Sequence, residues 1–310
     1  MGTPWFAVPS LKALVEAGFD IMEVVTRPEK PVGRGRIAAP TPVKQCALEL
    51  GLKVSEPASI GDRGFIKRIA SLAPDLIVVV AYGKILPLEV LRIPRMGCVN
   101  LHASVLPSYR GAAPINRAIM NGDKKTGVST MLMDSGMDTG PVLLKEEAGI
   151  GPDETAGELS ERLSVSGAGV LVKTLKLLFD GKITPKPQDN ARATYAPALK
   201  KEEGRIDWNL SPDEIRNRIR GLSPWPGAYT HLNGRLVKIH GGEALSDFRG
   251  ISEKRDVKPG GVVFAADDGI VVKCGKGVFK ITELQPESKR RMSAAQYLRG
   301  HRLGEESGFA

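Results

Sequence analysis

The sequence predicts an α/β protein with a doubly wound, mostly parallel sheet, followed by a small β-barrel domain of the OB-like kind. Strand-like and helix-like segments alternate through the first 180 residues, which is typical of a sheet with helices on its faces. Residues 75–83 form a continuous apolar run rich in β-branched side chains, as in a parallel strand buried on both faces. From residue 205 on, short strand-like segments are separated by Asn-Gly, Gly-Gly and Asp-Gly pairs, which indicates a barrel.

The pattern divides the chain into a first domain at residues 1–180, a linker at 181–204 and a second domain at 205–310. Apolar spacing, caps and glycines set the elements of the first domain. Helices are expected at residues 8–17, 43–50, 63–72, 113–121 and 154–180, and strands at 19–26, 52–54, 75–83, 127–134 and around Asn100 and His102.

The beginning of the chain departs from the alternation. A helix that opens an α/β unit normally follows a strand, and no strand precedes the helix at residues 8–17. We therefore expect the first strand of the sheet to be missing. Its absence would leave a central gap or an unpaired strand edge.

Residues 27–44 contain five basic residues against one acid, together with four prolines and the segment Gly33-Arg-Gly-Arg36. The prolines and glycines predict an irregular loop. One interpretation is a solvated charged loop, and the other is a loop that contacts phosphates through planar arginine donors. In the second interpretation its basic side chains include Lys30, Arg34, Arg36 and Lys44.

Composition narrows the classes of function. The 310 residues include 44 basic and 35 acidic ones, a net charge of +9, and the excess is shared by both halves. This favours a large polyanionic partner, although a merely basic protein has the same balance. The three cysteines have no paired spacing, so neither disulfides nor a zinc site is predicted. We see no signal peptide, no membrane-spanning run and no dinucleotide fingerprint, and we expect a cytoplasmic protein that transfers no hydride.

Three polar residues stand out against apolar neighbours. Asn100 and His102 alternate with Val99 and Leu101, so a strand would point both to one face. Asp138 follows one helix and one strand later. Ligands of doubly wound sheets lie beyond the carboxyl ends of the strands, and we expect the three side chains to meet there. An amide, an imidazole and a carboxylate form a plausible catalytic set. Each residue also has a structural interpretation: Asn100 could bond to a turn, His102 could be a satisfied core histidine and Asp138 could cap the next element.

The chain resembles the methionyl-tRNA formyltransferase family over nearly its whole length. The wider group of 10-formyltetrahydrofolate-dependent transformylases shares the asparagine, histidine and aspartate, and the arginine loop with the second domain narrows the resemblance to the tRNA enzymes. The motifs are Asn100-Leu-His-Ala-Ser-Val-Leu-Pro, Arg110-Gly-Ala-Ala-Pro, Met137-Asp-Thr-Gly, Gly2-Thr-Pro, Gly33-Arg-Gly-Arg, Val79-Val-Ala-Tyr-Gly, Tyr195-Ala-Pro, Gly204-Arg-Ile-Asp-Trp, Pro224-Trp-Pro, Leu284-Gln-Pro and Arg291-Met-Ser-Ala-Ala.

The resemblance implies transfer of a formyl group from 10-formyltetrahydrofolate to the α-amine of methionine on initiator tRNA, without a metal and by a monomer. It assigns catalysis to Asn100, His102 and Asp138. The folate-contacting segment falls on Ser104, Val105, Leu106 and Pro107. The tRNA-binding loop falls on residues 27–44 with Arg34 as its key arginine, and the C-terminal barrel also contacts tRNA.

The chemistry suits these residue types. Attack on a formyl carbonyl builds negative charge on its oxygen, which the amide of Asn100 and an imidazole N–H of His102 would stabilise. Asp138 would stabilise the imidazolium and fix its orientation. An α-amine titrates near ~8, so about a tenth is neutral at pH 7 and no strong base is needed. The amine proton would leave through water and Asp138.

Two other classes of function remain open from sequence. One is formyl transfer to another amine, such as that of a sugar nucleotide, or a hydrolase-like module of formyltetrahydrofolate dehydrogenase. The other is a non-catalytic RNA-binding protein on the same fold. The arginine loop disfavours the first, and the intact set of Asn100, His102 and Asp138 disfavours the second.

Overall fold

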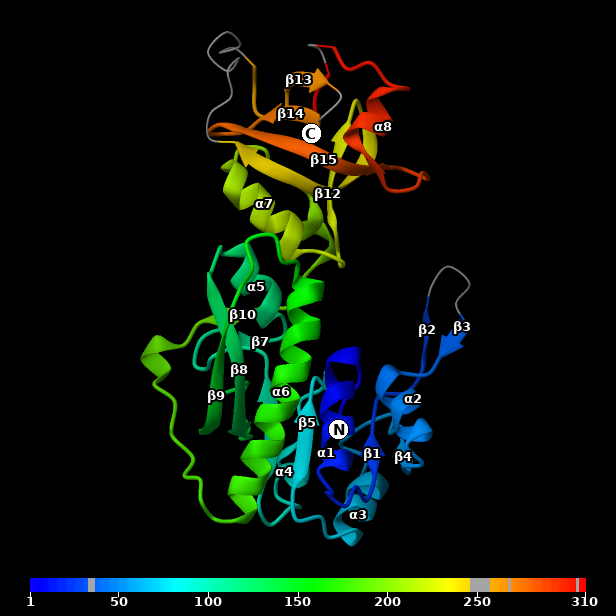
Figure 1. The fold of residues 1–310 in the computed structure, drawn as a ribbon. Helices are drawn as coiled ribbons and strands as arrows, with labels where there is room; N and C mark the ends of the chain where they lie inside the picture. The colour runs from blue at the N-terminus through cyan, green and yellow to red at the C-terminus, as the bar shows by residue number, and fades with distance from the viewer. Residues whose placement is uncertain (33–36, 246–256, 267–268, 305–306) are drawn as a thin grey trace. The chain divides into compact units, whose positions relative to one another are not determined.

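The computed structural model describes residues 1–32, 37–245, 257–266, 269–304 and 307–310 (Figure 1). The chain divides into two compact units. Unit 1 comprises Met1–Pro114, Lys125–Gly149 and Leu159–Pro197, and unit 2 comprises Ile115–Lys124, Ile150–Glu158 and Ala198–Ala310. No helix in the described part of the chain is long and apolar enough to cross a membrane.

The main sheet of unit 1 has the strand order β5-β6-β8-β9, with β5 at Ile77–Val80, β6 at Cys98–His102, β8 at Lys125–Leu132 and β9 at Val142–Gly149. A parallel pair, β1 (Val24–Val25) and β4 (Val54–Ser55), accompanies it. The predicted α/β class is confirmed. The strand β9 was not expected, and β8 runs antiparallel to β6 because it starts beyond His102 and runs back along that strand.

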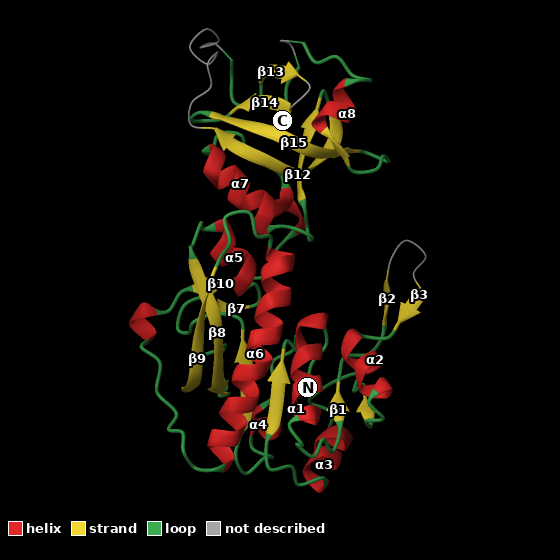
Figure 2. Ribbon diagram, viewed as in Figure 1, coloured by secondary structure: helices red, strands yellow, loops and turns green. Residues whose placement is uncertain are grey.

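The helices of unit 1 lie close to their predicted positions (Figure 2). Thr41 caps α2 and Asp62 caps α3, each by accepting a backbone N–H three residues on. At Gly167 of α6 a Cβ atom would lie 3.0 Å from Leu101, so the glycine lets this helix pack closely on β6. The bounds are η1 Trp5–Ala7, α1 Val8–Glu16, α2 Pro42–Glu49, α3 Arg63–Ser71, α4 Leu88–Leu91 and α6 Ala156–Phe179.

The first strand of the sheet was expected to be missing, which would leave a gap between β1 and β5. Among the described residues, only Met1 and Gly2 make backbone hydrogen bonds in this gap. The Met1 amine donates to the Val78 carbonyl at 2.6 Å, and the Met1 carbonyl accepts from Val80 N at 2.9 Å. Gly2 N donates to the Val25 carbonyl at 3.0 Å. A cavity of about 280 Å³ continues this gap, and its lining includes Ser10, Leu11, Leu14, Leu72, Leu175 and Phe179.

Part of the basic segment 27–44 forms a hairpin, β2 (Lys30–Val32) with β3 (Ile37–Ala39), so the prediction of an irregular loop was wrong there. Pro31 pairs with Ala38. A two-stranded ribbon consists of edge strands only, and proline is tolerated on an edge because its missing N–H would face solvent. Arg34 and Arg36 lie outside the described residues.

Unit 2 contains the antiparallel order β11-β12-β15-β14-β13, and β16 pairs with β15. Residues 307–310 join its two edges, because His231 N donates to the Ala310 carbonyl at 2.9 Å and Val262 N to the Ser307 carbonyl at 3.1 Å. The predicted small barrel is confirmed. The bounds are η3 Lys201–Gly204, α7 Pro212–Gly221, β11 Ala228–Leu232, β12 Arg235–Leu245, β13 Val262–Ala266, β14 Gly269–Lys273, β15 Val278–Pro286, β16 Met292–Ser293 and α8 Ala294–Leu298.

Candidate active site

Asn100 and His102 lie on β6, two residues apart, and therefore share one face of the strand. Both are buried, with 9% and 6% of their surface exposed. The hydrogen bonds of the described residues leave the Asn100 side-chain amide without a partner. A buried amide normally finds a protein partner, so this one is available to a ligand.

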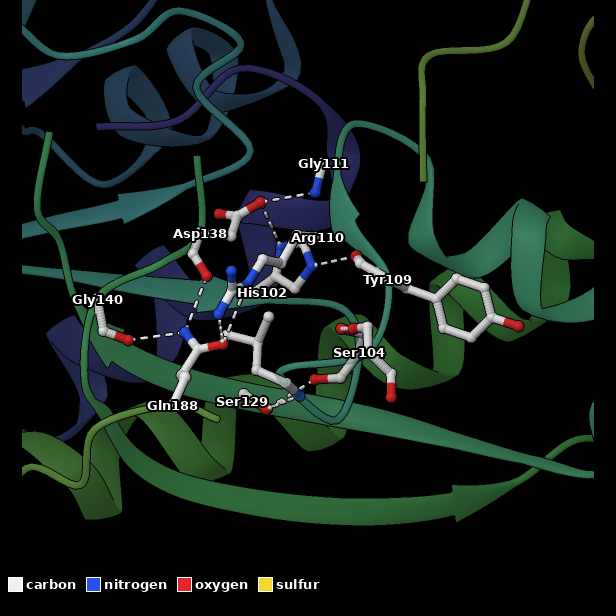
Figure 3. Close-up of polar contacts among 11 residues, drawn as sticks. His102, Ser104, Tyr109, Arg110, Gly111, Ser129, Asp138, Gly140 and Gln188 are labelled. Carbon is white, nitrogen blue, oxygen red and sulfur yellow. Dashed lines mark hydrogen bonds and ion pairs between the residues drawn. The ribbon is translucent and has the colours of Figure 1, made fainter. Parts of the chain in front are cut away.

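The orientation of His102 is set by the backbone of Tyr109 (Figure 3). Its Nε2 lies 2.9 Å from the Tyr109 carbonyl oxygen. Because a carbonyl only accepts, Nε2 carries a proton and donates it. The other nitrogen, Nδ1, lies 3.7 Å from Asp138 Oδ2. That separation exceeds a hydrogen bond, so Nδ1 remains open to a proton or to a substrate atom.

Asp138 comes from the connection between β8 and β9 and has a left-handed backbone, φ 55°. Its Oδ2 accepts the backbone N–H of Gly111 at 2.8 Å, in the short strand β7 (Arg110–Gly111). The structure thus brings the carboxylate to His102, as expected. The route differs from the expected one, because the antiparallel β8 ends away from His102 and the following loop carries Asp138 back.

The segment Ser104–Pro107 forms a turn fixed by its own polar groups. Ser129 Oγ donates to the Ser104 carbonyl at 2.7 Å and accepts from Leu106 N at 3.0 Å. Ser104 Oγ donates to the Ser108 carbonyl at 2.5 Å. Ser104 and Leu106 are fully buried. The half-buried side chains of the segment, Val105 and Pro107, are the ones placed to touch a ligand.

Lys145 on β9 supports the same turn, because its ammonium donates to the Leu106 carbonyl. Burial, followed by the nearby charge of Arg192, lowers the pKa of the Lys145 ammonium.

Cys98, at the start of β6, has its pKa raised to about 12 by burial. It is therefore a neutral thiol rather than a nucleophile.

The predicted phosphate-binding residues differ in their surroundings. Lys30 lies in β2. Lys44 Nζ lies 2.7 Å from both Glu29 Oε1 and Glu56 Oε2, and its hydrogen bond to Glu29 is the main cause that raises its pKa. Two carboxylates already compensate this ammonium, which makes it a weaker phosphate ligand than an unpaired lysine would be.

Several groups of the site could not be assigned from sequence. The Tyr109 carbonyl and the Gly111 N–H are backbone groups, and any residue type supplies them. Gln188 lies within the predicted linker, yet it reaches the Asp138 loop. The one signal that could have indicated Gln188 is its position shortly before Tyr195–Ala196. That segment forms β10, which pairs with β7 beside the site. No cluster of three or more possible metal-binding side chains occurs among the described residues.

Family models match the chain in two parts, "Formyl transferase" at residues 1–175 and "Formyl transferase, C-terminal domain" at residues 198–302. The methionyl-tRNA formyltransferase of Caldanaerobacter subterraneus subsp. tengcongensis is 49% identical over 306 residues, covering 98% of this chain and 97% of the relative. That of Geobacter metallireducens is 48% identical over 303 residues, covering 98% and 95%.

Solved structures show the same fold at lower identity. The crystal structure of WlaRD, a sugar 3N-formyl transferase in the presence of dTDP and 5-N-formyl-THF, matches with a TM-score of 0.66 and 18% identity. The match covers 93% of this chain and 97% of that one. An identity this low supports the shared fold and leaves the acceptor to be decided by the near relatives.

Proposed function

The chain belongs to the methionyl-tRNA formyltransferases, enzymes that formylate methionyl-tRNA, and we propose that it takes the formyl group from 10-formyltetrahydrofolate with Asn100, His102 and Asp138. The observation that carries the proposed site is the buried Asn100 amide, which has no hydrogen-bond partner within the described part of the chain. It stands beside a histidine whose second nitrogen faces a carboxylate.

In the proposed reaction the methionine amine attacks the formyl carbon. A carbon–nitrogen bond forms there, and the bond from that carbon to the folate nitrogen breaks. Negative charge builds on the formyl oxygen during the attack, and the Asn100 N–H stabilises it. Because this donor is already buried and oriented by β6, little reorganisation is needed when the charge develops.

His102 handles the proton that the amine loses, in place of the roles expected from sequence, in which its N–H stabilised the formyl oxygen and the proton left through water and Asp138. Its Nε2 proton is held by the Tyr109 carbonyl, which leaves Nδ1 to accept the amine proton and to return it to the departing folate nitrogen. Between these steps the ring is an imidazolium. The Asp138 carboxylate at 3.7 Å stabilises that charge.

The turn at Ser104–Pro107 supports the assignment of the folate site. It directly follows β6, so a ligand on Val105 and Pro107 would lie next to the catalytic side chains. The WlaRD structure was determined in the presence of 5-N-formyl-THF, which supports a formylated folate as the donor. Donation by 10-formyltetrahydrofolate is therefore the form of the reaction that we propose for this chain.

The partner that we propose for the basic segment 27–44 is the phosphate backbone of initiator tRNA. The net charge of +9 and the lysines and arginines of this segment support the proposal, with Lys30, Arg34 and Arg36 as the stronger candidates and Lys44 as the weaker one. We infer that the enzyme acts as a monomer in the cytoplasm, where charged tRNA is made.

The function is tested by incubating the protein with 10-formyltetrahydrofolate that carries a labelled formyl group and with methionine-charged initiator tRNA. We expect labelled formylmethionine after mild alkaline release from the tRNA. Methionine-charged elongator tRNA and a dTDP-amino sugar serve as parallel acceptors. Label on the sugar alone would favour the sugar-nucleotide alternative, and tRNA binding without any transfer would favour the non-catalytic one.

A further inference from the structure

We propose that Gln188 is a positioning residue that holds Asp138 in place for catalysis, and this inference rests on the proposed function of Asp138. Gln188 lies 50 residues after Asp138 in the sequence and outside the strand β6 that carries Asn100 and His102. Its side chain nevertheless connects to the site from both ends of the amide (Figure 3). No part of the reaction described above uses it.

The Gln188 amide joins two segments. Its Nε2 donates to the Asp138 carbonyl at 2.8 Å and to the Gly140 carbonyl at 2.7 Å. Its Oε1 accepts from Arg110, at 3.2 Å from Nε and 2.9 Å from a terminal nitrogen. Both donor hydrogens and both acceptor positions of the amide are therefore used, which fixes its orientation.

The Arg110 side chain, which binds the Gln188 amide, is itself held in place by burial and a further hydrogen bond. It is buried, with 2% of its surface exposed, and a terminal nitrogen also donates to Asn190 Oδ1 at 2.8 Å. The next residue, Gly111, donates its backbone N–H to the Asp138 carboxylate. Arg110 and Gln188 thus hold the Asp138 backbone while Gly111 holds its side chain.

The Asp138 loop needs such support. The left-handed φ of 55° is an unfavourable conformation for a residue with a side chain, and it persists only where the surroundings fix it. The carboxylate also has to stay 3.7 Å from His102 Nδ1 without a direct hydrogen bond to it. If the loop moved by about 1 Å, catalysis would fall by as much as about 10²-fold.

Gln188→Glu is the sharpest variant. The substitution keeps an acceptor for Arg110 and removes both N–H donors of the amide. It also places a carboxylate against the carbonyl oxygens of Asp138 and Gly140. We expect kcat to fall about 10- to 100-fold while KM for the folate and for the tRNA changes less than about threefold. Gln188→Ala, which adds no charge, should show the same pattern. Gln45→Glu, the same exchange at an exposed position on α2, should leave kcat unchanged.

A double-mutant cycle separates positioning from a general structural role. If Gln188 acts through Asp138, adding Gln188→Glu to Asp138→Asn should change kcat by less than about threefold, because the group being positioned is already lost. The proposal would be overturned if the effects of the two substitutions on kcat multiplied. It would also be overturned if both Gln188 variants kept the wild-type kcat while the wild type is active. An inactive wild type would instead refute the proposed function. Melting temperatures and folate binding identify a variant that has simply unfolded.

Discussion

Two buried serines of unit 1 show how differently two parts of this unit are built. Ser129 on β8 is 0% exposed and makes two hydrogen bonds to the turn after β6. Ser10 on α1 is 2% exposed, lines the cavity beside β1 and β5, and has no hydrogen-bond partner for its hydroxyl among the described residues. The serine that positions the turn of the proposed site is paired, whereas the serine beside the gap has no partner among the described residues.

The gap also holds a titratable group, the Met1 amine. The Met1 amine is buried, and among the described residues its one hydrogen-bond acceptor is the Val78 carbonyl. Burying a charge with so little compensation opposes folding. We therefore expect changes near the site to reduce stability or catalysis, and changes that neutralise or remove polar groups near the gap to increase stability.

For a protein prepared with Met1 as its first residue, the largest effect on stability should come from pH. Burial lowers the pKa of the Met1 amine from 8.0 to about 6. Between these values the unfolded chain binds a proton that the folded chain does not, so the free energy of unfolding falls as pH drops from 8 to 6. The two-unit difference corresponds to roughly 2–3 kcal/mol.

Urea unfolding at pH 6, 7 and 8 measures this change in a chain whose free Met1 amine is verified by mass spectrometry. Acetylation of that amine removes the titrating group and provides the control. Any other titrating group contributes equally to both chains. Identical pH dependence with and without the acetyl group would show that the amine is not buried as described.

Ser129→Ala should have the next largest effect. The change leaves Leu106 N, a buried donor, without its partner and takes a donor from the Ser104 carbonyl. An unsatisfied buried group costs about 1–3 kcal/mol, and we expect a loss of about 2 kcal/mol in the free energy of unfolding. Folate KM should rise as well, because the turn at Ser104–Pro107 loses its anchor. A stability equal to that of the wild type would contradict the described pairing.

Ser10→Ala should have the smallest effect and the opposite sign. It removes an unpaired buried hydroxyl and places a good helix former in α1. We expect the protein to gain about 1 kcal/mol in the free energy of unfolding, measured by urea denaturation. Ser71→Ala, at an exposed serine of α3, is the matched control. If Ser10→Ala destabilises the protein, its hydroxyl has a partner and the comparison with Ser129 fails.

Much of this fold follows from local pattern. The helix α6 and the strand β6 were expected because their apolar residues have clear spacing. The strand β9 was missed because Lys145, Glu146 and Glu147 interrupt its apolar run. These three residues are exposed, although the Lys145 ammonium reaches the Leu106 carbonyl, so they carry no signal of a buried strand.

The site was less predictable in its connections than in its catalytic side chains. Asn100 and His102 share a face by simple alternation. The approach of Asp138 depends on an antiparallel β8 and on a left-handed residue, neither of which the spacing shows. The contact of Gln188 with the Asp138 loop joins residues far apart in sequence. Contacts of that kind arise from tertiary packing, which local propensity does not encode.

The central claim is that Asn100, His102 and Asp138 carry the transfer, and His102→Ala tests it most directly. The measurement is a single-turnover rate of formyl transfer to methionyl-tRNA, with tRNA and folate binding determined on the same preparation. We expect the rate to fall about 10²- to 10⁴-fold, as for the loss of a general acid–base group, while both binding constants stay within about threefold. A wild-type rate in this variant would contradict the assignment.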